Sequence, residues 1–243
     1  MLHLIRKAAD AALDLVYPRG VSCALCGADL ERQGGVLCEE CGERMPRIAG
    51  HCCPGCGRSV AAEGLCRMCR QFGPASGGGF ASFDYEGTVR QLLIDFKFND
   101  KTGYRELFAY CMIDTLRGGG IDDEIDCVVP VPMHWRRRFY RGYNQSGLLA
   151  SWIAQSLGKP LVKGVLARPV YTRIVSRTAG GPKERMENAL KSFRPGKGTL
   201  AGKTALLVDD ILTSGATMRA CAAILRRMGA AKVYSVVAAA VPE

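Results

Sequence analysis

The chain has 243 residues, of which 48% are hydrophobic and 23% charged, as in a folded globular protein with one ordinary domain and a small appendage. Its 33 Lys and Arg against 23 Asp and Glu give a formal net charge of +10, which permits phosphates or nucleic acids as partners without requiring them. No apolar run approaches the length of a membrane span, so we expect no transmembrane segment.

The first seventeen residues have apolar positions that are interrupted by charges at Arg6, Lys7, Asp10 and Asp14. They lack the uninterrupted apolar region of a secretory signal and predict a short amphipathic helix instead. A chain without such a signal is expected in the reducing cytoplasm, where its many thiols would hold zinc rather than form disulfides.

Eight of the twelve cysteines form four Cys-x-x-Cys pairs: Cys23/Cys26, Cys38/Cys41, Cys53/Cys56 and Cys66/Cys69. This spacing is typical of zinc knuckles, in which both thiolates bind one tetrahedral ion. The simplest prediction is two tandem four-cysteine ribbons holding two structural zinc ions, although exchange of knuckles between the two sites fits the spacing equally well. Cys52 and His51 lie beside the third pair and could substitute as ligands, but we expect an unused core thiol and a surface histidine there.

Six arginines make this cysteine-rich segment basic: Arg32, Arg44, Arg47, Arg58, Arg67 and Arg70. They fit contacts with nucleic-acid phosphates, and a solvated charged surface explains them equally well. The composition of residues 73–79 is that of a linker. We therefore predict an N-terminal helix with a double zinc ribbon over 1–72, a linker over 73–79 and a main domain over 80–243.

In the main domain, strand-like and helix-like segments alternate along the chain. The predicted strands cover residues 80–85, 126–132, 161–166, 205–208 and 232–241, and the predicted helices cover 88–97, 107–116, 146–157 and 217–228. This alternation favours an α/β fold with a mostly parallel sheet flanked by helices. Cys111, Cys127 and Cys221 have apolar neighbours and are expected to be buried core thiols.

A cluster of four arginines follows the strand at 126–132: Arg136, Arg137, Arg138 and Arg141. Guanidinium groups bind phosphate oxygens in pairs of hydrogen bonds, so the cluster predicts a phosphate-binding surface. The phosphates of a nucleic acid would suit it equally well, with Tyr140 and Tyr143 available to stack on bases.

The most informative stretch is residues 205–217, an apolar run followed by Asp209 and Asp210, a turn rich in hydroxyl groups and a helix. Ligands of parallel sheets lie beyond the carboxyl ends of the strands, where we expect the two acids. They would bind sugar hydroxyls or face a Mg²⁺ ion, and the small residues 213–217 would hold a phosphate at the start of the helix. The pattern therefore predicts a pocket for a ribose 5-phosphate.

Two other interpretations of this stretch are weaker. A helix cap needs one residue, and here two acids precede the turn. A nucleotide P-loop is disfavoured because residues 202–204, Gly-Lys-Thr, come before the strand instead of after it.

Residues 208–217 resemble the motif that binds phosphoribosyl pyrophosphate (PRPP) in type I phosphoribosyltransferases. The resemblance implies that Asp209 and Asp210 contact the ribose hydroxyls. It also implies that the 5-phosphate lies against Thr213, Ser214, Gly215, Ala216 and Thr217. The loop with Pro132 and Met133, helped by the arginine cluster, would bind the pyrophosphate with Mg²⁺. His134 in that turn is a weaker candidate for a ligand contact.

Taken in order, further motifs resemble the ComF family, which has a double zinc ribbon ahead of a phosphoribosyltransferase-like domain. They are Tyr85-Glu86-Gly87, Phe96-Lys97-Phe98, the Val-Pro-Val-Pro strand end at 129–132, residues 141–145 (Arg-Gly-Tyr-Asn-Gln), and Arg185 and Asn188 ahead of Phe193. This family is associated with competence, the cytoplasmic handling of incoming single-stranded DNA. The resemblance thus implies single-stranded DNA and DNA-uptake proteins as partners.

The sequence predicts a ComF-type protein that binds PRPP or a ribose 5-phosphate. The alternative is an active Mg²⁺-dependent transferase in which a nitrogen nucleophile displaces pyrophosphate from PRPP. No residue that would recognise an acceptor is identifiable. The segment 173–185 departs from the family pattern, and Gly180-Gly181-Pro182 in it predicts a mobile loop.

Overall fold

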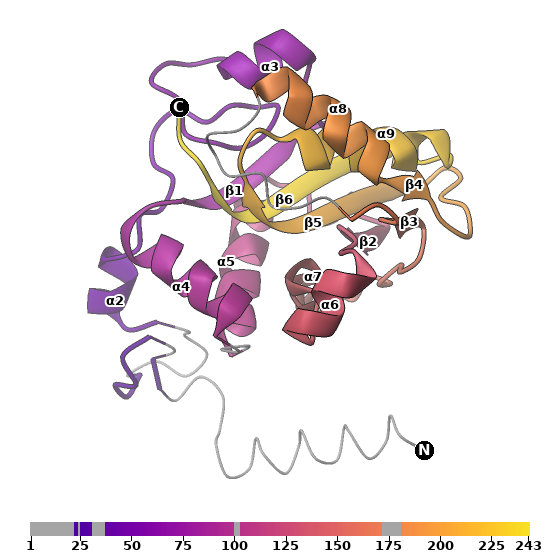
Figure 1. The fold of residues 1–243 in the computed structure, drawn as a ribbon. Coiled ribbons are helices and arrows are strands. Elements are labelled where there is room, and N and C mark those ends of the chain that lie inside the picture. The colour runs from indigo at the N-terminus through magenta and orange to yellow at the C-terminus, as the bar shows by residue number, and fades with distance from the viewer. Residues whose placement is uncertain (1–21, 24, 31–36, 100–102, 172–180) are drawn as a thin grey trace, which may run out of the picture. The chain divides into compact units, whose positions relative to one another are not determined.

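The computed structural model describes residues 22–23, 25–30, 37–99, 103–171 and 181–243 (Figure 1). The chain forms two compact units, Met1–Met45 and Pro46–Glu243. In the described part of the first unit, the one helix is α2 (Glu39–Glu43). The helix predicted within residues 1–17 lies outside the described residues.

The second unit is built on a parallel four-stranded sheet with the order β1-β6-β5-β2. Its strands are β1 (Gly79–Asp84), β2 (Cys127–Pro130), β5 (Thr204–Leu212) and β6 (Lys232–Ala240). Every residue of β6 except Lys232 is buried, as expected for a central strand covered on both faces. The predicted α/β fold with a parallel sheet is confirmed.

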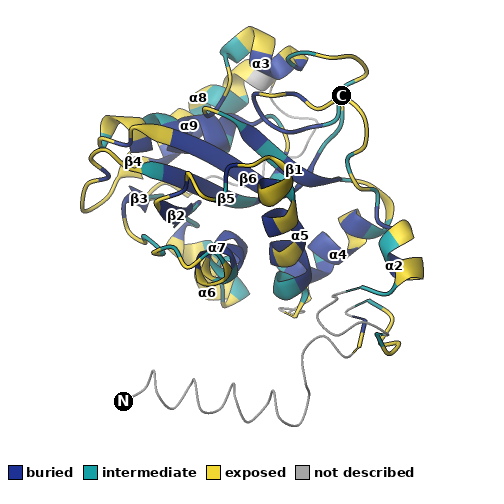
Figure 2. Ribbon diagram, turned by 180° about the vertical axis from the view of Figure 1, so that it is seen from behind, coloured by how far each residue is buried: buried dark blue, intermediate teal, exposed yellow. Residues whose placement is uncertain are grey.

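Helices cover both faces of this sheet, and Figures 1 and 2 agree on their sides. One side carries α4 (Gly87–Phe98), α5 (Tyr104–Gly118) and α7 (Gln145–Ser156), with the short helix α6 (Trp135–Arg141) beside α7. The other side carries α8 (Pro182–Ser192) and α9 (Ala216–Arg227), and α3 (Arg67–Phe72) lies near the same side. Figure 2 shows that the strands between these layers are mostly buried.

Buried aromatic rings and thiols fill the space between the sheet and its helices. The ring centroids of Phe83 and Phe108 are 6.4 Å apart, and both side chains are fully buried. Cys111, Cys127 and Cys221 are buried, as predicted. No helix among the described segments combines the length and the apolar character needed to cross a bilayer.

The strand predicted over 161–166 is not continuous. Leu161 forms a single parallel bridge with Val128, and the chain then turns at Gly164, whose φ is +84°. Only β3 (Leu166–Ala167) follows, and it pairs in the antiparallel sense with β4 (Arg194–Pro195). Val162 N still donates to Val128 O at 2.9 Å, and the glycine turn then takes the chain away from the edge of the main sheet.

The segment predicted as a linker, residues 73–79, is packed against the sheet. Gly77 N donates to Val233 O at 2.7 Å, and the hydroxyls of Ser76 and Ser235 are 2.9 Å apart. The second group of cysteines, residues 53–69, therefore shares a compact unit with the sheet. The module boundary expected at 73–79 stays a prediction.

Candidate functional site

Asp209 and Asp210 lie at the point where β5 extends past its neighbour β2. The β2–β5 pairing ends at Pro130 and Val208, whereas the β5–β6 pairing continues to Leu212 and Ala240. The acids were expected after the strand, but they lie within it, because β6 continues the ladder on one side. On the β2 side, the sheet has ended and the two acids face a cleft.

Each carboxylate has a partner from a different helix. Ser146 of α7 donates its hydroxyl to Asp209 Oδ1 at 2.6 Å, and the backbone N–H of Asp210 donates to the same oxygen at 3.0 Å. Lys97 Nζ lies 3.0 Å from Asp210 Oδ2. Desolvation, followed by repulsion from the adjacent Asp210, raises the pKa of Asp209 to about 6. At Asp209, desolvation and the neighbouring acid thus outweigh the hydrogen bonds and the nearby Lys97 charge.

The turn between β5 and α9 is built around a left-handed glycine. Gly215 caps α9 with φ +75°, a left-handed conformation that favours glycine. Thr213, Ser214 and Thr217 line the cleft, whereas Gly215 and Ala216 do not and contribute backbone to the turn. The N–H groups at the start of a twelve-residue helix thus lie next to a hydroxyl-bearing rim.

The cleft encloses about 930 Å³ and brings most of the predicted site residues together. Pro132, Met133, Arg137 and Arg141 line it along with both acids and the turn. Arg136 and Arg138 do not line it. Arg137 and Arg141 are four residues apart in α6 and therefore share one face of the helix, and Arg136 and Arg138 point away from that face.

His134 has a structural role at the start of α6. Its side chain is buried; Nδ1 accepts from the backbone N–H of Arg136 at 3.1 Å, and Nε2 lies 3.1 Å from Pro169 O. It does not line the cleft. The histidine caps and anchors the helix that carries Arg137 and Arg141.

The sequence did not assign several charged residues to this site. Seven cations and three carboxylates line the cleft: Arg58, Arg67, Lys97, Arg137, Arg141, Arg168 and Arg185, with Asp209, Asp210 and Glu243. Lys97 and Arg185 lie in the motifs that carry the resemblance to the ComF family, so a signal for them existed. Arg168 carried none. The excess of cations suits a ligand with several phosphates.

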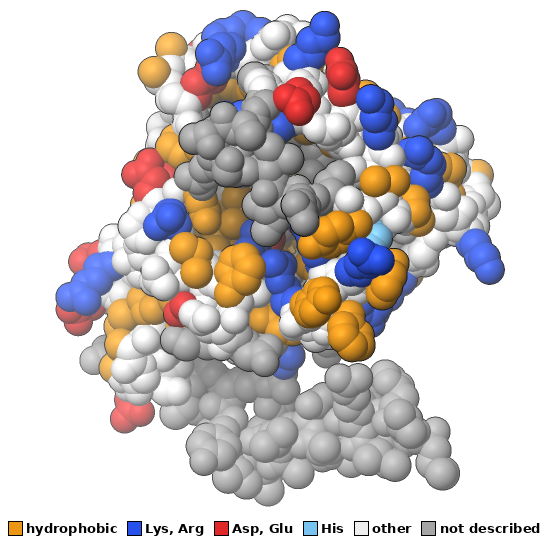
Figure 3. Space-filling view, viewed as in Figure 1, with side chains coloured by type: hydrophobic (Ala, Val, Ile, Leu, Met, Phe, Trp, Pro, Cys, Tyr) orange, Lys and Arg blue, Asp and Glu red, His pale blue; other side chains and the backbone are white. Residues whose placement is uncertain are grey.

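A second surface lies beside the cleft, on the outward face of α6. Trp135, Phe139 and Tyr140 are 65%, 81% and 85% exposed. The guanidinium of Arg136 lies 5.3 Å from the Trp135 ring centroid. Figure 3 shows hydrophobic and basic side chains next to one another in this region.

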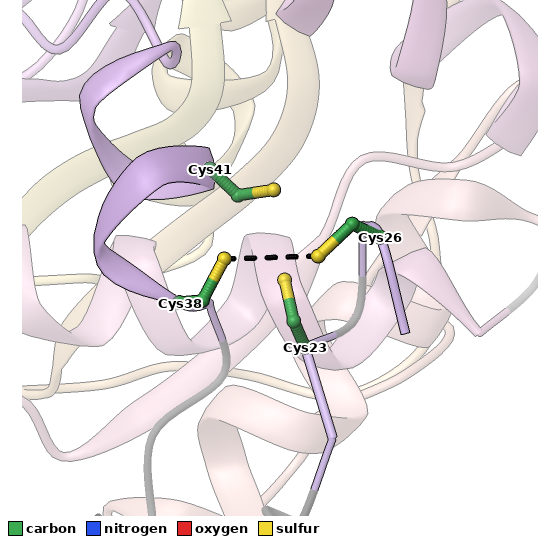
Figure 4. A group of neighbouring side chains, drawn as sticks. All are labelled: Cys23, Cys26, Cys38 and Cys41. Carbon is green, nitrogen blue, oxygen red and sulfur yellow. Dashed lines mark hydrogen bonds between the residues drawn. The ribbon is translucent and has the colours of Figure 1, made fainter. Parts of the chain in front are cut away.

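The eight paired cysteines form two groups in which all sulfur atoms lie within 4.8 Å of one another. The first group is Cys23, Cys26, Cys38 and Cys41, and the second is Cys53, Cys56, Cys66 and Cys69. Figure 4 shows the first group converging from two segments. The groups join the first pair with the second and the third with the fourth, so the knuckles are not exchanged. Cys52 belongs to neither group.

These groups fit zinc by distance and by chemistry. The sulfurs of Cys26 and Cys38, and those of Cys56 and Cys66, are 3.7 Å apart. Four ligands at the usual Zn–S length on a tetrahedron would be about 3.8 Å apart. The backbone N–H of Cys66 also donates to Cys53 Sγ at 3.3 Å, a hydrogen bond that stabilises a thiolate ligand. Eight thiol ligands leave no open coordination position, so both sites are of the structural type.

Comparison with known proteins finds two domains in the chain. Residues 12–70 match the double zinc ribbon domain, and residues 148–243 match the phosphoribosyl transferase domain. Competence protein F of Haemophilus influenzae is 27% identical over 110 residues, which are 44% of this chain and 47% of that protein. The match thus spans about half the length of that relative.

DNA utilization protein YhgH of Salmonella typhimurium is 28% identical over 176 residues, which are 69% of this chain and 74% of that protein. A solved purine phosphoribosyltransferase from Pyrococcus horikoshii Ot3 is 18% identical with a TM-score of 0.35, covering 54% of this chain and 69% of that chain. The chain is therefore a homologue of competence protein F and DNA utilization protein YhgH that joins a double zinc ribbon to a phosphoribosyl transferase domain, as its resemblance to the ComF family predicted.

Proposed function

We propose that the cleft binds PRPP, or a ribose 5-phosphate, together with Mg²⁺. The observation that carries this proposal is the meeting of three groups in one cleft: the acids of β5, the turn 213–217, and the loop with Pro132 and Met133. Each group suits a different part of one ligand. The phosphoribosyl transferase match over residues 148–243 supports the same ligand class.

In this proposal the ribose hydroxyls donate to Asp209 and Asp210. The 5-phosphate accepts from the backbone of the turn and from the hydroxyls of Thr213 and Thr217. Arg137 and Arg141 face the diphosphate, whose remaining charge Mg²⁺ would neutralise when bound. Lys97 pairs with the Asp210 carboxylate next to the site, at 3.0 Å.

Titration calorimetry with PRPP and Mg²⁺ tests this proposal. Asp209→Asn and Asp210→Asn are each expected to weaken binding by about tenfold or more, because an amide is a weaker acceptor than a carboxylate. Asp114→Asn is the matched control, since Asp114 pairs with Arg47 outside the cleft. Absence of PRPP binding by the unaltered protein would overturn the proposal.

Turnover separates a binding protein from the transferase alternative. In the transferase reaction a nitrogen lone pair forms the new C–N bond at the anomeric carbon while the C–O bond to pyrophosphate breaks, and the nitrogen then loses a proton. Pyrophosphate release should be measured with a panel of bases and amines. PRPP binding without release for any of them would exclude transfer to the acceptors tested.

A second proposed function, cytoplasmic handling of single-stranded DNA, rests on the outward face of α6. Exposed aromatic rings next to arginines are the combination on which unpaired bases stack while phosphates are neutralised. The names of the relatives, competence protein F and DNA utilization protein, fit this role. Partners among DNA-uptake proteins belong to the same proposal.

Fluorescence anisotropy with a labelled oligothymidylate over a range of salt concentrations tests the second function. Replacing Arg136 and Arg138 by Gln is expected to weaken binding and to lower the salt slope by about 0.7 for each lost phosphate contact. Arg90→Gln on α4 is the control, because Arg90 is exposed and does not line the cleft. No binding at low salt, or equal binding by all variants, would contradict the assignment to α6.

A further inference from the structure

The second cysteine group is pressed against the backbone of the sheet. A Cβ on Gly79 at the start of β1 would lie 2.3 Å from Cys56 Cα, and one on Gly57 would lie 2.6 Å from Ala81 N. Arg58, Arg67 and Met68 of the same cysteine segment line the cleft. This metal site and the ligand cleft therefore share a wall.

Arg219 of α9 connects the cysteine group to the phosphate turn. Its side chain is 92% buried (8% exposed), and its guanidinium donates in several directions. Nη2 donates to Cys69 Sγ at 3.3 Å and to Met68 O at 3.1 Å, Nε donates to Gly73 O at 2.9 Å, and Nη1 donates to Ser214 O at 3.0 Å. One rigid planar group thus spans from a zinc ligand to the turn.

Arg58 makes a parallel connection from the other side. It follows Cys56 by two residues, is 6% exposed, and donates through Nη2 to Thr213 O. Two buried guanidinium groups therefore hold the first two carbonyl oxygens of the turn 213–217. Arg58 belongs to the cysteine segment itself, whereas Arg219 belongs to α9 and donates to that segment at Met68 O and Cys69 Sγ.

We propose that the second cysteine group is a working part of the ligand site: metal at Cys53, Cys56, Cys66 and Cys69 positions the turn 213–217 through Arg219 and Arg58. A zinc ion with four thiolates carries a net charge of about −2, which favours a cation such as Arg219 beside Cys69. Without the metal, the sulfurs lose their fixed positions and Arg219 loses an anchor. Arg219 and Arg58 are positioning residues in this proposal.

The proposal rests on the proposed function only where PRPP is used as the probe. Because coupling between two sites is reciprocal, metal should change affinity for the ligand, and ligand should change the environment of the metal. The first cysteine group provides an internal comparison, since it belongs to the other compact unit.

Hydrogen–deuterium exchange tests, without any ligand, whether Arg219 holds the turn 213–217 in position. Arg219→Gln is expected to retain the zinc content of the unaltered protein and to speed amide exchange in residues 213–218 by about tenfold or more. Arg226→Gln is the matched control: it lies on the same helix and donates to Ala75 O at 3.0 Å, far along α9 from the turn. Unchanged exchange at 213–218 in Arg219→Gln would overturn the proposal.

Cobalt substitution tests the reciprocal part. A Cys23→Ser/Cys26→Ser variant loaded with Co²⁺ carries the ion only in the second group, where its visible thiolate bands report on the sulfurs. Addition of Mg²⁺ and PRPP is expected to shift these bands, and Arg219→Gln in the same background is expected to abolish the shift. A shift that Arg219→Gln leaves intact, or no shift despite PRPP binding in calorimetry, would overturn the coupling.

These experiments separate the two proposals. If the protein fails to bind PRPP, the proposed function fails, while the exchange experiment still decides whether Arg219 holds the turn. If PRPP binds, and neither Arg219→Gln nor removal of the metal changes amide exchange at 213–218, the proposed function stands and the proposed coupling fails.

Discussion

At the scale of single residues, Asp209 carries a cost to folding of the kind found at ligand-binding sites. Its carboxyl is desolvated beside Asp210, and its pKa is raised to about 6 from an ordinary 3.8. Because the folded pKa is the higher one, protonation favours the folded state as pH falls from about 6 toward 4, and ionisation disfavours it above 6. A group that opposes folding at neutral pH is typical of a functional site.

Asp209→Asn is therefore expected to stabilise the protein at pH 7.5, by about 1 kcal/mol or a few degrees in Tm. The amide oxygen can still accept from Ser146 while the repelling charge is gone. Thermal unfolding between pH 5.5 and 8 checks this, and the advantage should shrink below pH 6. The same titration predicts that PRPP affinity of the unaltered protein falls as pH drops through about 6. A variant less stable than the parent across this range would contradict the assignment.

Gly215 is a second residue whose identity the structure explains. Its φ of +75° disfavours any other residue, and a Cβ there would lie 2.6 Å from Arg219 Nη1. Gly215→Ala is expected to cost about 1–3 kcal/mol of stability and to weaken PRPP binding, because it strains the turn and displaces Arg219. Chemical denaturation and calorimetry measure both effects.

Gly202→Ala separates a general loss of stability from a local effect at the turn. Gly202 has a similar φ of +70° but open space around a Cβ. This variant should lose stability and keep its PRPP affinity. Equal loss of affinity in both variants would show that general destabilisation, and not the local change at the turn and Arg219, weakens binding.

At the scale of elements, α6 shows why part of the site escaped sequence-based prediction. None of its seven residues is buried, so it has no apolar periodicity, which is the main signal for a helix. It forms because His134 caps its start and Gly142, with φ +80°, ends it. The arginine cluster was recognisable in the sequence, but its division into Arg137 and Arg141 on the cleft and Arg136 and Arg138 outside required the helix.

Because the aromatic rings of α6 are exposed, they contribute little to folding. Phe139→Ser with Tyr140→Ser is expected to change stability by no more than about 0.5 kcal/mol. The same variant should weaken oligothymidylate binding by about 1–3 kcal/mol for each lost stacking contact. Thermal unfolding and anisotropy measure the two quantities. A large loss of stability would mean that these rings pack on the protein instead of serving a ligand.

At the scale of the whole molecule, the two cysteine groups differ in accessibility. All four cysteines of the second group are buried, whereas Cys26 is exposed and Cys38 half-buried in the first. A mercurial titrated against the protein, with a chromogenic zinc indicator, should therefore release two zinc ions in two phases. Zinc release from the first group should come first and leave residues 213–218 protected from amide exchange. Zinc release from the second group should then abolish that protection. Release in one phase, with both effects together, would contradict this order.

The sequence by itself determined the local chemistry of this protein. Patterns among near neighbours in the chain are visible in the sequence. Alternating apolar segments predicted the parallel sheet, the cysteine spacing predicted the two four-cysteine groups, and residues 205–217 predicted the acid pair followed by a turn. Tertiary structure decided what lies across from what. Pairing with β6 extends β5 beyond the two acids, and Lys97 and Ser146 contact the carboxylates from separate helices. Arg219 contacts both Cys69 and Ser214, which precedes Arg219 by five residues. Such contacts join segments up to about 150 residues apart (Arg219 to Cys69), and no local pattern encodes them, because they depend on how the helices and the cysteine segment pack on the finished sheet.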